Sequence, residues 1–120
     1  MIFLVEDDEP LREALRLTFE VEGFQVRAFA DAESLLVDTE APAGGCLVLD
    51  QKLPGMDGLE LVMDLRARGV DLPTVLITTP TAAVIRRAAA CGVPLVEKPL
   101  LNQTLVNTVL ALLGRDSEGG

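Results

Sequence analysis

The 120-residue chain lacks histidine, tryptophan and tyrosine, and it has two cysteines, Cys46 and Cys91. The cysteines lie far apart in sequence and form no CxxC pair, which argues against a structural zinc site. We expect both to be reduced, buried thiols. Four phenylalanines are the only aromatic residues, so stacking on nucleic-acid bases or flavins is poorly supported.

Basic residues are also scarce, because ten Lys and Arg stand against 19 Asp and Glu and give a net charge of −9. A nucleic-acid-binding surface needs a basic footprint, so we expect no direct nucleic-acid binding by this domain. No apolar run approaches the ~18 residues of a membrane span. The apolar residues 1–5 form too short a stretch for a signal peptide. We therefore expect a cytoplasmic protein without membrane contact.

The length fits one domain, and a hydrophobic content of 49% is enough to build a core. Strand-length apolar stretches alternate with stretches of helical periodicity, and glycines follow several of the latter. The predicted strands are residues 2–5, 24–29, 46–49, 75–77 and 93–96, and the predicted helices are residues 10–21, 32–37, 59–68, 82–90 and 101–113.

This strict alternation predicts an α/β fold with right-handed crossovers. We expect a doubly wound (βα)5 three-layer sandwich with a parallel sheet. Residues 24–29 alternate between apolar and polar, which favours an edge strand. The domain is expected to span residues 1–114, and residues 115–120 are expected to form a polar, disordered tail.

Polar residues follow four of the predicted strands. Because the carboxyl ends of parallel strands meet at one edge of a sheet, we expect these side chains to converge. Acidic residues before a helix are often caps, and an aspartate before Pro and Gly is often a turn residue. Such independent roles do not explain why all the polar segments fall on one edge of the sheet. The segments are Glu6-Asp7-Asp8, Asp50, Thr78-Thr79 and Glu97-Lys98-Pro99.

The chemistry of this set is that of phosphoryl transfer. Two carboxylates ~4 Å apart repel by ~4 kcal/mol at an effective dielectric near 20, so such a cluster recruits a cation. Oxygen ligands without His or Cys suit Mg²⁺. Lys98 offers a mobile positive charge for phosphate, and Thr78 offers a hydroxyl donor. An aspartate can itself accept the phosphoryl group and form an aspartyl-phosphate.

Four segments together resemble the response-regulator receiver family of two-component signal transduction. They are residues 3–12 (FLVEDDEPLR), 47–58 (LVLDQKLPGMDG), 76–78 (LIT) and 96–99 (VEKP), so the resemblance covers nearly the whole chain. The resemblance implies a flavodoxin-like fold with the sheet order 2-1-3-4-5. It implies Asp50 as phosphoacceptor, Thr78 as switch hydroxyl and Lys98 as the phosphate-pairing lysine. It also implies a cis Lys98–Pro99 bond, and a loop shaped by Pro54 and Gly58.

The resemblance further implies a magnesium site. Asp7 and Asp50 would be ligands, Glu6 would act mostly through water, and the backbone carbonyl of Lys52 would be the third protein ligand. The partner would be a sensor histidine kinase or a phosphotransfer protein, and a homodimer stays open. Such a domain is a phosphoacceptor rather than an enzyme, with at most weak self-catalysed phosphorylation and dephosphorylation.

Some positions depart from the family pattern. Leu95 stands where an aromatic switch residue is usual, and we expect it to stay fully buried. The helix near residues 82–90 should be short and loosely packed, with Val84 and Ile85 as its large anchors. These departures keep an alternative open, a receiver-like protein-interaction module with impaired or atypical switching.

Other classes fit less well. A nucleotide- or flavin-binding domain would carry a glycine-rich loop after the first strand, where this chain has acidic residues. A phosphohydrolase would usually carry a second acid at the position of Lys52.

Overall fold

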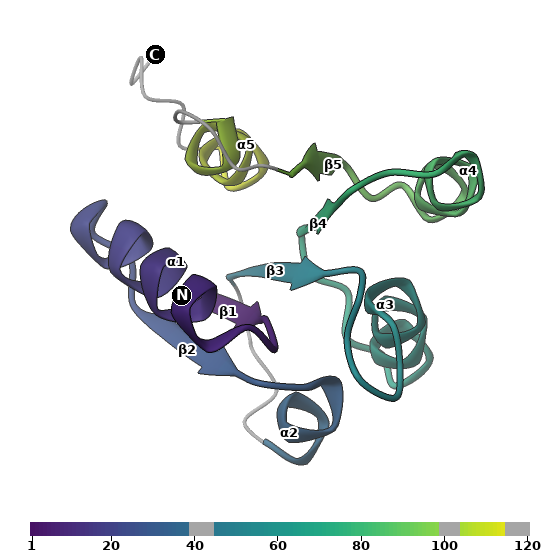
Figure 1. The fold of residues 1–120 in the computed structure, drawn as a ribbon, viewed down its shortest axis with the longest axis horizontal. Coiled ribbons are helices and arrows are strands. Elements are labelled where there is room, and N and C mark those ends of the chain that lie inside the picture. Colours follow the sequence, from purple (N-terminus) through teal and green to yellow (C-terminus); the bar gives the residue numbers. More distant parts are fainter. Residues whose placement is uncertain (39–44, 99–103, 115–120) are drawn as a thin grey trace.

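Helices and strands alternate along the chain in the computed structural model, which describes residues 1–38, 45–98 and 104–114. The predicted (βα)5 order is confirmed (Figure 1). The elements are β1 (Ile2–Val5), α1 (Glu9–Val21), β2 (Val26–Phe29), α2 (Ala32–Val37), β3 (Cys46–Asp50), α3 (Gly58–Ala67), β4 (Thr74–Thr78), α4 (Ala82–Cys91), β5 (Leu95–Glu97) and α5 (Thr104–Leu112).

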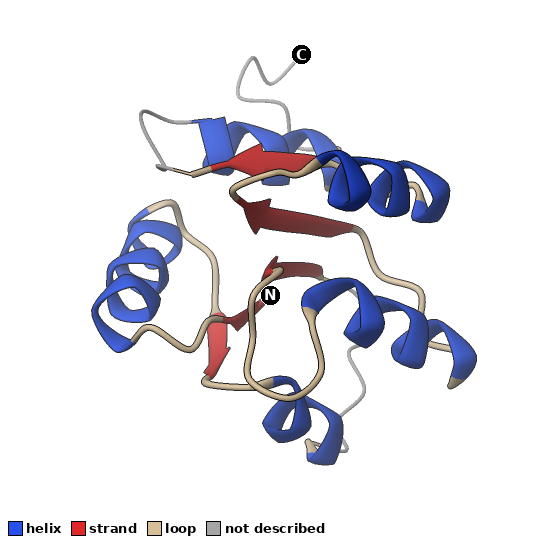
Figure 2. Ribbon diagram, turned by 45° about the vertical axis from the view of Figure 1, so that its right-hand side comes forward, coloured by secondary structure: helices blue, strands red, loops and turns tan. Residues whose placement is uncertain are grey.

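The strands form one parallel sheet in the predicted order, β2-β1-β3-β4-β5. Helices α1 and α5 cover one face, and α2, α3 and α4 cover the other (Figures 1 and 2). Successive strand residues point to opposite faces, so Ile2 and Leu4 join the core under α1 and α5, while Phe3 and Val5 join the core under α2 and α3. The sheet therefore has a separate apolar core on each face.

The three central strands are buried along their whole length, whereas β2 is half-buried at the sheet edge. This confirms the predicted edge strand. The predicted fifth strand began too early. Helix α4 ends at Gly92 in a left-handed conformation, and the Val93 N–H still bonds the Ala88 carbonyl, 2.9 Å away. Because Pro94 has no N–H, strand pairing starts only at Leu95.

Helix α4 has ten residues, one more at its end than the predicted range of 82–90. Its packing is sparse as predicted, since Ala88 is its one buried residue among those described. Ile85 is not an anchor, because 49% of it is exposed. Leu95 is half-buried rather than fully buried, because it lies on an edge strand beside this alanine-rich helix.

The two cysteines differ in burial. Cys46 is the first residue of the central strand β3 and has none of its surface exposed, as expected, and burial raises the pKa of its thiol to about 12. Cys91 is half-exposed at the end of α4, which corrects the prediction that both thiols are buried.

Other predictions fall on residues that are not described. The cis bond involves Pro99, the start of the last helix was placed at residue 101, and the tail covers residues 115–120; all three lie outside the described ranges. Within those ranges, none of the helices combines the length and apolar character that crossing a membrane requires.

Candidate functional site

Asp50 is the last residue of β3, the central strand, and its carboxylate is almost completely buried. The Lys98 Nζ donates to Asp50 Oδ2 at 2.9 Å, and the Lys52 N–H donates to Oδ1 at 3.1 Å. Lys98 follows β5, two strands away, and its own N–H donates to the Thr78 carbonyl at 2.9 Å. Both carboxylate oxygens of Asp50 are therefore held by donors, one of them cationic.

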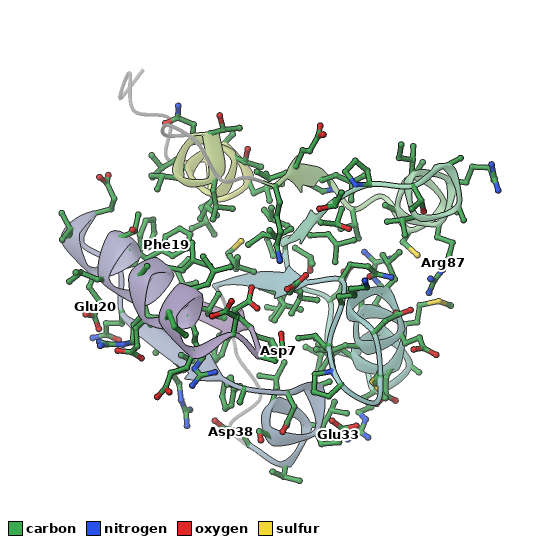
Figure 3. The ribbon with its side chains drawn as sticks, viewed as in Figure 1. Asp7, Phe19, Glu20, Glu33, Asp38 and Arg87 are labelled. Atoms are coloured by element: carbon green, nitrogen blue, oxygen red, sulfur yellow. The ribbon has the colours of Figure 1, made fainter. Side chains whose placement is uncertain are left out.

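Glu6, Asp7 and Asp50 gather at the carboxyl edge of the sheet. Each offers a carboxylate oxygen that lies within 4.8 Å of the others. Glu6 directly follows β1 and is buried. Asp7 is exposed where the chain turns into α1 (Figure 3). The structure thus brings together the three acidic side chains that the sequence predicted as metal ligands.

The acidic run after β1 serves two purposes. Asp8 caps α1, accepting from the Leu11 N–H at 3.3 Å, as the capping interpretation predicted for this run. Its own N–H donates to Glu6 Oε2 at 3.1 Å. Arg12 on α1 donates from Nη1 to the Glu6 carbonyl at 2.9 Å. The hydrogen bonds of Asp8 and Arg12 therefore hold the turn that carries Glu6 and Asp7 against α1.

Burial and neighbouring charges shift the pKa values of two groups in the site, Glu6 and Lys98. Burial, together with the nearby Asp50, raises the pKa of Glu6 to about 7, although the Asp8 N–H and Lys98 favour its ionised form. For Lys98, burial acts to lower the pKa, but the hydrogen bond to Asp50 and the surrounding carboxylates outweigh it and raise the pKa. The site lacks positive charge relative to its acids.

A hard divalent cation fits this donor set. Glu6 Oε1 is buried and has no hydrogen-bond partner among the described residues. Buried polar atoms are normally satisfied, so this oxygen is available to a metal ion or to its bound water. Three carboxylates without nitrogen or sulfur ligands suit Mg²⁺ chemistry. The acidic group could therefore bind a metal ion.

The remaining predicted residues lie at the same edge. Thr78 ends β4, is buried, and pairs in register with Glu97 of β5. Lys52 has an exposed side chain, and its main-chain N–H is the group that contacts Asp50.

The loop between β3 and α3 contains contacts that sequence reasoning missed. Gln51 is buried, and its side-chain Oε1 accepts from the Leu59 N–H of α3 at 2.9 Å. Asp57 caps α3 in a reciprocal box with Glu60 and also accepts from Arg87 of α4 at 3.2 Å. The signal for the box was present, since an Asp with a Glu three residues later precedes a helix. The Gln51 and Arg87 contacts had no such signal.

With this geometry established, comparison with known proteins identifies the family. The family model of the response regulator receiver domain matches residues 2–110. The chain belongs to this family. Nodulation protein W of Bradyrhizobium diazoefficiens is 33% identical over 118 residues, covering 97% of this chain and 52% of its own length. The transcriptional regulatory protein FixJ of Azorhizobium caulinodans is 32% identical, covering 99% and 57%.

Solved receiver structures share the fold. The crystal structure of FixJ-N has a TM-score of 0.85 and 26% identity over 94% of this chain and 92% of that one. Full-length FixJ from B. japonicum also has a TM-score of 0.85, with 27% identity over 95% of this chain and 57% of that one. The receiver chain spans about half the length, or less, of the first curated relatives it matches.

Proposed function

We propose that this receiver domain accepts a phosphoryl group on Asp50 in a magnesium-dependent reaction and acts as a signalling switch. The observation that carries the proposal is the Asp50 carboxylate, held by Lys98 on one oxygen and flanked by Glu6 and Asp7. A buried aspartate in contact with an ammonium group and two further acids suits phosphoryl transfer, where positioning and charge neutralisation provide most of the catalysis.

Each residue of the site has its own role in the proposed phosphoryl transfer. A carboxylate oxygen of Asp50 attacks phosphorus, the bond from phosphorus to the donor nitrogen or oxygen breaks, and the leaving group keeps that electron pair. Lys98 pairs with the phosphoryl oxygens, and the Thr78 hydroxyl donates a hydrogen bond to one of them. Asp7, Asp50 and the Lys52 carbonyl would hold the ion, and Glu6 would act through water. When bound, Mg²⁺ supplies neutralisation of the carboxylates and of the transferred group.

The phosphoryl donor is a sensor histidine kinase or a phosphotransfer protein. The domain itself is a phosphoacceptor and contributes at most weak self-catalysed phosphorylation and dephosphorylation. It occupies residues 1–114 and works in the cytoplasm. Its net charge of −9 supports a role without direct nucleic-acid contact.

The test is intact mass after exposure to acetyl phosphate and Mg²⁺. The wild type should gain one phosphoryl group, and Asp50→Asn should gain none. Asp71→Asn is the matched control, because Asp71 is an exposed aspartate in the α3–β4 connection, away from the site. Equal labelling of wild type and Asp50→Asn would refute the assignment. Absence of labelling in the wild type would favour the interaction module without switching.

A further inference from the structure

Gln51 begins the loop between β3 and α3 and forms hydrogen bonds to both β4 and α3. Its N–H donates to the Ile77 carbonyl at 3.0 Å, its carbonyl accepts from the Gly58 N–H at 3.0 Å, and its side-chain Oε1 accepts from the Leu59 N–H at 2.9 Å. These bonds join β3, β4 and the first turn of α3. Gln51 is only 7% exposed, so the amide side chain reaches α3 through the protein interior.

The side-chain hydrogen bond of Gln51 satisfies an N–H group in the first turn of α3. The first N–H groups of a helix have no partner inside it, and an unpaired buried N–H is costly. Asp57 satisfies the Glu60 N–H, while Leu59 is fully buried and its N–H is satisfied by Gln51. Gln51 is therefore a second cap of α3, contributed from the strand that carries Asp50.

The close approach of α3 makes this contact rigid. A Cβ atom at Gly58 would lie 2.7 Å from the Asp50 carbonyl and 2.8 Å from Leu76 Cδ1. The start of α3 thus packs directly against the peptide between Asp50 and Gln51. The peptide that follows Gln51 carries the Lys52 N–H, which donates to Asp50 Oδ1 at 3.1 Å. Lys52 carries both this N–H and the carbonyl predicted as a metal ligand, so a displacement of its backbone would change that bond and move the carbonyl as well.

We propose that the Gln51 side chain is a positioning residue for the metal site: by anchoring the backbone after Asp50 to α3, it holds the Lys52 carbonyl and the Asp50 carboxylate in the orientation that binds Mg²⁺. The inference rests on the proposed function. In this role Gln51 would act through the backbone of Asp50 and Lys52 and not as a ligand of the ion.

The test compares two apolar replacements with a matched cap deletion. Gln51→Leu and Gln51→Met preserve side-chain bulk and remove the amide acceptor. Asp57→Ala removes the other cap of α3 without altering the residue next to Asp50. We expect Mg²⁺ affinity, measured by calorimetric titration, to fall about tenfold in both Gln51 variants and to change less than about twofold in Asp57→Ala. All three should lower the urea midpoint, because each removes a helix cap.

A second readout separates positioning from general loosening. The rate of phosphorylation by acetyl phosphate should be reduced in the Gln51 variants at low Mg²⁺ and should recover at saturating Mg²⁺. Mg²⁺ affinity at the wild-type value in both Gln51 variants would overturn the positioning role, as would an equal loss in Asp57→Ala. A wild type that binds Mg²⁺ but is not phosphorylated on Asp50 would overturn the proposed function instead, and the affinity comparison would still decide the role of Gln51.

Discussion

Ionisation of Glu6 should make the metal-free domain less stable as pH rises. The folded-state pKa of Glu6, about 7, lies above its ordinary value of 4.5 because the side chain is buried beside Asp50. The neutral form is thus favoured by folding. Its contribution to stability is complete below pH 4.5 and is lost as pH rises through about 7. The full pKa difference corresponds to ~3 kcal/mol in the free energy of unfolding. About 2 kcal/mol of this stabilisation is lost between pH about 5.5 and pH about 8.

Urea unfolding in EDTA at these two pH values measures the effect. The wild type should be about 2 kcal/mol less stable at the higher pH, and Glu6→Gln should lose most of this difference because an amide does not ionise. Glu22→Gln, which replaces an exposed acid beyond the end of α1, is the control and should keep the wild-type difference. Saturating Mg²⁺ should stabilise the wild type most at high pH, where Glu6 is ionised. An equal pH difference in wild type and Glu6→Gln would refute the reasoning.

Three further substitutions test other parts of the site. Asp7→Ala should abolish the Mg²⁺-induced rise in melting temperature. The metal-free variant should be unchanged or up to about 1 kcal/mol more stable, because the substitution removes repulsion with Asp50. An undiminished Mg²⁺ shift would contradict the role of Asp7 as a ligand. Gly58→Ala should destabilise by ~1–3 kcal/mol in urea unfolding despite the better helix propensity of Ala, because the new Cβ collides with the Asp50 carbonyl; a gain in stability would contradict the contact. Arg87→Ala should lower the free energy of unfolding by less than ~1 kcal/mol, because the ion pair between Arg87 and Asp57 is largely exposed. A loss above ~2 kcal/mol would show that the pair is stronger than its exposure indicates.

The acidic site could be predicted because parallel topology places strand ends together. Asp50, Asp7 and Lys98 each follow an apolar run, and once those runs are strands of one parallel sheet, their proximity is a geometric consequence. The alternation of runs predicted the parallel sheet, and the strand order came from the family resemblance. The same reasoning explains why Asp8 remained ambiguous, since a residue between a strand and a helix can serve either the site or the helix end.

Other features depend on details that apolar patterning does not encode. Continuity of apolar residues extended the last strand back to Val93, but the left-handed Gly92 and the missing N–H of Pro94 delay pairing to Leu95. Ile85 looked like an anchor because it is large and apolar, yet α4 turns its alanine Ala88 inward. The Gln51 contact depends on a side-chain conformation and on how closely α3 approaches, and no spacing rule predicts either.

The unequal burial of the two cysteines makes the natural protein a ready-made single-site labelling substrate. Alkylating reagents attack the thiolate, and Cys46 is enclosed by the sheet with its pKa raised to about 12, so it should not react while the domain is folded. Cys91 lies partly exposed at the end of α4, the sparsely packed helix. A maleimide-linked fluorophore or spin label would therefore attach to α4 without any substitution, and modification of Cys46 would report unfolding in the same sample.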